Sequence, residues 1–257
     1  MNTEVKSAAR MLDLLEYLAG CSEPVKLKEI VAALGFPKSS AHALAQTLVS
    51  RGYAIQDDTE RYVLVHASRH RSATRAHEAR LVSAAHPIME QLRDLSGETV
   101  VLAVRTTRGE SKRLAKCVSR QAIRFDVDLD GNSESYCTAT GRLLLAHWDA
   151  ALANAYLARV PLMARTPKTV IDPDAIRALF VSIRETGISV CDEEHIAGST
   201  GLAVPVRGRD GSVVAALNLG VVTTRYRIRG DELIAMLKGA GEKISERLGY
   251  RGSTSQG

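Results

Sequence analysis

The sharpest pattern of apolar and polar positions lies in residues 27–52 and predicts two short helices joined by a tight turn. In residues 27–34 the apolar side chains recur three and four positions apart, which places them on one face of a helix. Gly35 can adopt the left-handed conformation that ends a helix. Pro37 suits the first turn of the next helix, because its missing N–H would have no intrahelical partner there. We therefore expect a second helix over residues 38–50.

This second helix has a buried stripe and a polar face. The stripe consists of Ala41, Leu44, Ala45, Leu48 and Val49. The outward face consists of Lys38, Ser39, Ser40, His42, Ala43 and Gln46. Two helices across a Gly-containing turn, the second with small polar and basic residues on its free face, are typical of a helix-turn-helix that reads the DNA major groove. An ordinary pair of packed helices has the same pattern and remains the alternative.

The flanking segments favour DNA binding. After the second helix, YAIQDDTERYVLV alternates around the polar turn DDTE, which predicts a hairpin. Before the first helix, Val5–Ala19 has helical apolar spacing. A helix, a helix-turn-helix and a hairpin in this order form a winged helix. Arg51 and Arg61 flank the predicted wing, where DNA phosphates would pass.

The remainder of the chain mixes helices with strands. Residues 66–84 contain few apolar residues and predict an exposed helix that joins two domains. A separate helix is expected to begin at Pro87 and to end at Gly97. Strands are expected in TVVLAVR, RLAKCV, IRFDV and ISVCDEEH and in the hairpin GLAVPVRGRDGSVVAALNLGVV. Further helices are expected after Thr138, over residues 150–160 and 172–187, and over Gly230–Leu248. This mixture predicts an α+β fold for the second domain.

Composition narrows the class of protein. With 257 residues, of which 45% are apolar and 25% charged, the chain suits two modest globular domains. We find no apolar run near the length of a membrane span and no secretory core at the N-terminus, so we expect no membrane partner and a cytoplasmic location. The four cysteines show no metal-binding spacing, so we expect neither a metal nor a cofactor. The net charge of +5 is modest, but arginines concentrate in residues 61–80, where they would either neutralise phosphates or cover a solvated linker helix.

Four segments resemble, in sequence and in order, the IclR family of bacterial transcriptional regulators. They are ALGFPKSSAHALAQTLVSRGY, ATGRLLLA, RETGISVCDEEHIAG and LAVPVRGRDGSVVAALNL. The resemblance implies a winged helix-turn-helix domain, a linker helix and a GAF-like or profilin-like effector-binding domain. We place these at residues 1–66, 67–85 and 86–250, followed by a disordered tail at 251–257. The resemblance also implies double-stranded DNA and a small-molecule effector as partners of a homodimer or homotetramer.

The resemblance further implies which residues line the effector pocket. Carried over position by position, they are Cys137, Thr138, Ala139, Cys191, Gly201, Asn218 and Gly220. Members of the family often have His, Asp, Cys, Ser and Ser where this chain has Cys137, Cys191, Gly201, Asn218 and Gly220. These changes remove hydroxyls and a charge and open space, so a short keto or hydroxy acid is a poor fit.

We therefore expect a bulkier and less polar effector, such as an aromatic or acyl acid. Its carboxylate would be anchored by Asn218 and by the helix start near Thr138, where exposed N–H groups attract anions. Capping of that helix is the alternative role of Thr138.

For DNA, we expect a division between base contacts and phosphate contacts. Base contacts are expected from Lys38, Ser39, Ser40, His42 and Gln46, and phosphate contacts from Lys28, Arg51 and Arg61. On this basis Gln46→Ala should relax sequence preference, whereas Arg51→Ala should weaken all duplexes alike.

The residues and the resemblance together predict a ligand-responsive transcriptional regulator, more often a repressor, that controls genes for the catabolism of a small organic acid and is not an enzyme. The alternative is a thiol- or metal-dependent enzyme with an appended DNA-binding module, built on Cys137, Cys191 and His195. The spacing assigns neither an orienting group for the histidine nor an oxyanion hole. A purely architectural DNA binder would not need the second domain.

Overall fold

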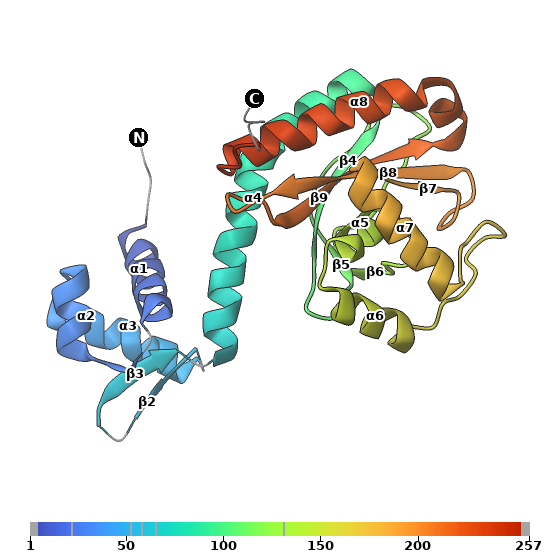
Figure 1. Cartoon of the computed structure of the whole chain (residues 1–257). Helices are drawn as coiled ribbons and strands as arrows, with labels where there is room; N and C mark the ends of the chain where they lie inside the picture. Colours follow the sequence, from blue (N-terminus) through green and yellow to red (C-terminus); the bar gives the residue numbers. More distant parts are fainter. Residues whose placement is uncertain are drawn as a thin grey trace, which may run out of the picture. The chain divides into compact units, whose positions relative to one another are not determined.

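The computed structural model describes residues 5–21, 23–51, 53–57, 59–64, 66–130 and 132–252, and for residues 66–75, 132 and 133 it describes the backbone alone. The chain forms two compact units, residues 1–79 and 80–257 (Figure 1). None of the helices in the described ranges has the length and the hydropathy that crossing a membrane requires.

The first unit has the predicted order of helix, helix-turn-helix and hairpin. Its elements are α1 (Lys6–Gly20), β1 (Val25–Lys26), α2 (Leu27–Leu34), α3 (Lys38–Ser50), β2 (Ala54–Gln56) and β3 (Arg61–Leu64). Gly35 ends α2 with a φ of 64°, in the left-handed region that favours glycine. Pro37 precedes the first turn of α3 as its N-cap rather than lying within it. The short strand β1 was not predicted; it pairs Val25 with Tyr62 and so joins the entrance of α2 to the hairpin.

The helix α4 (His66–Ser96) is continuous, so the predicted break before Pro87 is wrong. Proline removes one helical hydrogen bond and crowds the preceding turn. Here Pro87 is exposed, and the buried stripe on the opposite side of the helix continues past it without interruption. The stripe consists of Leu81, Ala85, Ile88, Met89 and Leu92, all buried. Packing of this stripe within the core of the second unit outweighs the lost hydrogen bond.

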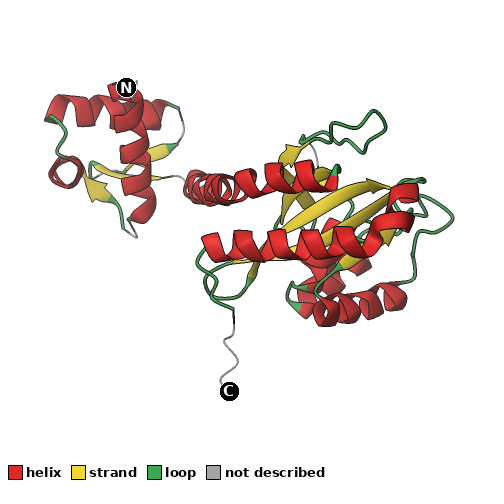
Figure 2. Cartoon of the chain, turned by 90° about the horizontal axis from the view of Figure 1, so that it is seen from above, coloured by secondary structure: helices red, strands yellow, loops and turns green. Residues whose placement is uncertain are grey.

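The second unit contains one antiparallel sheet between two layers of helices. Its further elements are β4 (Thr99–Arg105), β5 (Ser111–Cys117), β6 (Asn132–Ser133), α5 (Ala139–Ala146), α6 (Ala150–Arg159), α7 (Pro173–Thr186), β7 (Ser189–Asp192), β8 (Ser199–Arg207), β9 (Val213–Val222) and α8 (Thr223–Arg247). The strand order is β6-β5-β4-β9-β8-β7. The helix α8 and the second half of α4 lie over one face of the sheet, and α5, α6 and α7 lie over the other (Figures 1 and 2).

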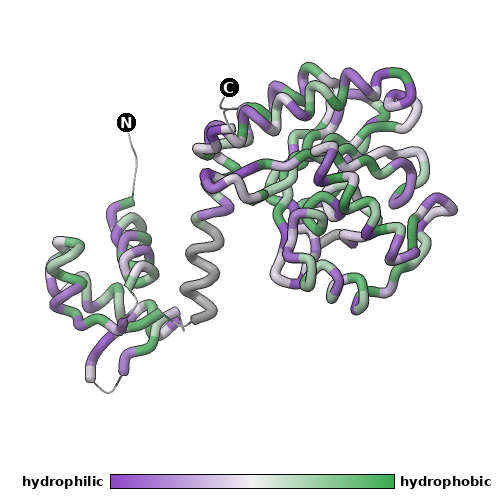
Figure 3. The backbone as a smooth tube through the Cα atoms, in the orientation of Figure 1, coloured by the Kyte–Doolittle hydropathy of each residue, from purple (hydrophilic) through white to green (hydrophobic). Residues whose placement is uncertain are grey.

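Alternation along the central strands separates the two faces. Leu202 and Val204 of β8 belong to the core under α4 and α8, whereas Ala203 between them belongs to the core under α5, α6 and α7. The strand β9 alternates in the same way. Figure 3 shows these central strands in mostly hydrophobic colours, because both faces are covered. Side chains on the face toward α5 are smaller, and this face carries the pocket described below.

Two further predictions about the second unit need correction. The segment IRFDV, predicted as a strand, is a loop between β5 and β6. Its carbonyl groups accept hydrogen bonds from side chains, with the Phe125 carbonyl bound by the Thr99 hydroxyl at 2.5 Å and the Val127 carbonyl by Lys116 Nζ at 2.7 Å. The last helix begins at Thr223 instead of Gly230, and a kink at Arg229 accounts for the later predicted start. Of the predicted tail, residues 253–257 lie outside the described residues.

A half-buried histidine makes the stability of the second unit depend on pH. His147 follows α5, and its Nε2 atom is buried with no hydrogen-bond partner among the described residues. Burial, together with the positive charges of Arg207 and Arg184, lowers the pKa of His147 to about 4. In the unfolded chain a histidine titrates near pH 6.5, so only the unfolded state gains a proton as the pH falls from about 6.5 toward 4. Stability should therefore be lost over that range.

We expect His147→Gln to weaken this acid sensitivity. The measurement is the urea midpoint at pH 7.5 and at pH 5, followed by the fluorescence of Trp148, the single tryptophan of the chain. The midpoint of the wild type should fall more between the two pH values than that of the variant. His86→Gln is the control, because the His86 side chain is 46% exposed. An identical fall in the wild type and in His147→Gln would contradict the assignment.

Candidate functional site

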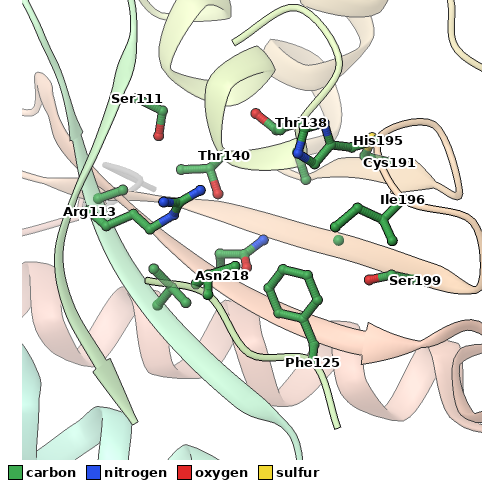
Figure 4. Close-up of a pocket in the computed structure, with 16 residues that line it drawn as sticks. Ser111, Arg113, Phe125, Thr138, Thr140, Cys191, His195, Ile196, Ser199 and Asn218 are labelled. Atoms are coloured by element: carbon green, nitrogen blue, oxygen red, sulfur yellow. The ribbon is translucent and has the colours of Figure 1, made fainter. Parts of the chain in front are cut away.

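A pocket of about 660 Å³, including its opening, lies on the face of the sheet toward α5 (Figure 4). Its floor is formed by residues that alternate along the strands onto this face. They are Val101 and Ala103 of β4, Gly201 of β8, and Asn218 and Gly220 of β9. The register pairs Val101 with Asn218 and Gly201 with Gly220 directly. The pocket therefore exists because the central strands carry small residues on this face.

The start of α5 forms the opposite wall. The Thr138 hydroxyl accepts a hydrogen bond from Gly141 N at 3.2 Å and donates to the Glu134 carbonyl at 2.9 Å, so capping is one role of Thr138. A Cβ atom on Gly201 would lie 3.2 Å from Ala139 Cβ and 3.9 Å from Ala139 N. Glycine at position 201 thus keeps open the space in front of the first helical N–H groups.

A buried ion pair holds the loop after β7 against α5. Arg142 is 1% exposed and makes two hydrogen bonds of 2.5 Å to the Glu194 carboxylate, and its Nε donates to the Tyr136 carbonyl at 2.6 Å. Paired hydrogen bonds from a planar guanidinium fix the orientation of the carboxylate as well as its position. The next residues of the loop, His195 and Ile196, line the pocket. The ion pair therefore positions one side of the pocket.

The two buried thiols next to the pocket are held in their protonated form. Cys137 Sγ lies 3.5 Å from His195 Nδ1, and Cys191 Sγ donates to the Cys137 carbonyl at 2.9 Å. Burial raises the pKa of each thiol to about 12, and the nearby Glu134 carboxylate adds to the effect at Cys137. A nucleophilic cysteine needs a lowered pKa. The observed environment does the opposite.

One group of side chains has the geometry of a metal site. Ligand atoms of Glu134, Cys137 and His195 lie within 4.8 Å of one another, and Cys191 is not part of this group. The Glu134 carboxylate is already engaged by the Arg165 guanidinium, which lowers its pKa. A metal would have to displace that ion pair and the proton of the buried thiol. The predicted set of Cys137, Cys191 and His195 is thus only partly assembled.

The structure brings together all of the predicted pocket residues except Cys137, which is buried behind the wall. The residues that line the pocket as expected are Thr138, Ala139, Cys191, Gly201, Asn218 and Gly220. The prediction omitted the other lining residues, among them Ser111 and Arg113 of β5 and Phe125 and Val127 of the following loop.

The space opened at Gly220 is filled, contrary to the prediction. A Cβ atom at this position would lie 2.1 Å from Phe125 Cδ1. Glycine is therefore what lets the Phe125 ring enter the pocket (Figure 4). The result is an apolar wall instead of an empty region.

The first unit carries a hollow surface next to α3. It is lined by Lys26, Leu27, Lys28, Lys38, Ser39, His42, Gln56, Thr59, Glu60 and Tyr62. Of the predicted DNA contacts, this places Lys28, Lys38, Ser39 and His42 on one exposed surface. The lysines of α2 and α3 give the surface a positive side that suits phosphate.

The other predicted DNA contacts lie elsewhere. Gln46 does not face outward as predicted, because its amide donates to Gln56 Oε1 at 2.9 Å and to the Tyr62 hydroxyl at 3.3 Å. Ser40 is also half-buried. Arg51, at the end of α3, and Arg61, on β3, are exposed outside the hollow. Gln46 thus ties α3 to the wing.

Two family models match this chain. The model of the IclR helix-turn-helix domain matches residues 7–58, and the model of the C-terminal domain of bacterial transcriptional regulator IclR matches residues 73–246. The chain is 28% identical over 215 residues to the Pca regulon regulatory protein of Pseudomonas putida, covering 83% of this chain and 73% of that protein. It is 27% identical over 252 residues to the transcriptional repressor IclR of Escherichia coli, covering 97% and 91%.

Solved structures agree with this match. A transcriptional regulator of Silicibacter sp. TM1040 has a TM-score of 0.65 at 27% identity, covering 95% of this chain and 97% of that one. An IclR homologue from Microbacterium hydrocarbonoxydans, solved with 4-hydroxybenzoate, shares the fold with a TM-score of 0.63 at 24% identity, covering 94% and 98%. Since the two family models together account for most of both units, the chain belongs to the IclR family of bacterial transcriptional regulators.

Proposed function

We propose that this regulator represses genes for the catabolism of a small organic acid and that the acid acts by binding in the pocket of the second unit. The observation that carries the proposal is that one chain combines an exposed, lysine-bearing α3 with a separate pocket that has one cation and apolar walls. Repression is supported by relatives that are themselves repressors, among them the acetate operon repressor of Salmonella typhimurium, which is 28% identical.

The proposed effector is an aromatic or acyl acid. Val101, Val127 and Phe125 give the pocket an apolar lining that a two- or three-carbon acid would leave largely uncovered. The homologue solved with 4-hydroxybenzoate supports the same class. The proposed contacts are Thr138, Ala139, Cys191, Gly201, Asn218 and Gly220, with Cys137 in support behind them.

The proposed DNA surface is the exposed face of α2, α3 and the wing. Lys38, Ser39 and His42 would reach base edges, and Lys28, Arg51 and Arg61 would contact phosphates. Residues 1–66 would act as the reading head, 67–85 as the linker and 86–250 as the sensor. A homodimer or homotetramer in the cytoplasm would present paired reading heads to a palindromic operator.

A gel-shift titration against the DNA that flanks its own gene, with a salt series and random duplex as competitor, tests this function. We expect saturable binding that survives the competitor. Ser39→Ala should lower the preference for the operator over random duplex. Arg51→Ala should weaken binding to both duplexes and reduce the slope of log binding constant against log salt concentration by about 1. Gln46→Ala should loosen the wing and so weaken binding to both duplexes as well.

Binding that disappears to the same extent on both duplexes as the salt concentration rises would leave only a non-specific electrostatic contact.

The thiol chemistry of the alternative enzyme is tested by alkylation. At pH 7.5 we expect iodoacetamide to label the half-buried Cys21 first and the buried Cys117, Cys137 and Cys191 only after unfolding. Mass spectrometry of peptides labelled with and without urea gives the rates. Fast labelling of Cys137 in the folded protein would reveal an activated thiol and reopen the enzyme interpretation.

A further inference from the structure

A β-bulge turns Arg113 into the pocket. Strands β4 and β5 pair Leu102 with Ala115 and then Ala103 with Arg113, so that Leu114 is the extra residue. Leu102 and Ala115 belong to the core under α4 and α8, and simple alternation would place Arg113 there too. The bulge reverses that alternation and gives Arg113 the same face as Ala103, which lines the pocket. Figure 4 shows the guanidinium directed into the pocket.

The guanidinium of Arg113 has hydrogen-bonding capacity left over. Its Nη1 donates to the Asp128 carbonyl at 2.8 Å, and it forms no ion pair with any carboxylate in the described part of the chain. Its position is half-buried, and burial lowers the pKa of Arg113, an effect that the nearby Asp128 carboxylate opposes only in part. Arginine keeps its charge in proteins, so this cation is available to an anion that enters the pocket.

Among the described residues that line the pocket, Arg113 is the single charged side chain, and His195 is the other titratable base. Burial lowers the pKa of His195, and the nearby positive charges of Arg165 and Arg113 act in the same direction although Glu134 opposes them. His195 is therefore neutral at neutral pH. One cation in an otherwise uncharged pocket matches one negative charge on the ligand.

The Phe125 ring supplies the complementary apolar surface. It enters the pocket beside Gly220, and its backbone carbonyl is fixed by the Thr99 hydroxyl. Ile196 contributes from the loop after β7. Aromatic rings favour offset or edge-to-face contacts with a second ring and gain stability beyond the buried area. The pocket thus presents an aromatic face on one side and a guanidinium on another (Figure 4).

We infer that the pocket selects an aromatic monocarboxylate, with Arg113 binding its carboxylate and Phe125 packing against its ring. This inference rests on the proposed function and specifies its ligand and its two specificity-determining residues. The carboxylate anchor is then an arginine of β5, in addition to the helix start and Asn218 that the sequence indicated.

Isothermal titration calorimetry of the full-length protein with benzoate and with benzamide tests the inference, because the two ligands differ in charge and hardly in shape. The wild type should bind benzoate about ten- to a hundredfold more tightly, the range that a charge-assisted contact provides. Arg113→Gln should abolish this preference, and Arg113→Lys should retain part of it. The control is Arg124→Gln, which removes a cation from the loop that carries Phe125. The Arg124 side chain is exposed, and among the described contacts it is bonded only to the Gln121 carbonyl. This variant should behave as the wild type.

A second pair of ligands tests the apolar part. Phe125→Leu should weaken the binding of benzoate several-fold and leave the weak binding of pyruvate unchanged. Phthalate, which carries two carboxylates, should bind the wild type less tightly than benzoate does.

Three results would overturn the inference. These are a benzoate preference that persists in Arg113→Gln, pyruvate binding more tightly than benzoate, and no binding of benzoate to a wild-type protein that still binds its operator. The gel shift requires no ligand, so loss of operator binding would identify a failure of the proposed function instead. Circular dichroism of each variant confirms that it is folded.

Discussion

The alternation of side chains across the central antiparallel sheet is the constraint on which the second unit depends. Because successive residues point to opposite faces, β8 and β9 can pack leucines and valines against α4 and α8 while presenting Gly201, Asn218 and Gly220 to α5. Large residues on the second face would close the pocket. A shift of one residue in register would exchange the two faces and expose the core, so the same pattern that stabilises the sheet also creates the pocket.

Much of the fold follows from local patterns in the sequence. Apolar spacing and end signals give the bounds of α2 and α3, and Asp172 with Gly187 delimits α7 as N-cap and left-handed C-cap. Local patterns do not show where packing or hydrogen bonds from other parts of the chain override a local preference. The helix α4 continues through Pro87 because its buried stripe is continuous, and IRFDV is a loop because side chains distant in sequence satisfy its carbonyls.

Only part of the pocket lining could be predicted from the sequence. The residues at the start of α5 and along β8 and β9 could be named because the resemblance to the IclR family carries them over position by position, and the structure places them around one pocket. Arg113 could not be named, since an unbulged strand would direct it to the other face. The place of the Phe125 ring in the pocket depends on the absence of a Cβ atom at position 220, far away in the sequence. Helical spacing predicts that Gln46 faces DNA, because spacing alone does not show that the wing offers this side chain two hydrogen-bond partners.

A regulator of this kind requires that ligand and operator change each other's affinity by the same factor, since coupling between two sites is reciprocal. The most direct test is the dissociation constant of benzoate measured by calorimetry with and without a saturating operator duplex. We expect weaker benzoate binding in the presence of the operator, by the factor with which benzoate weakens operator binding. Equal dissociation constants in both conditions would contradict it, because the pocket would then have no influence on the DNA-binding unit.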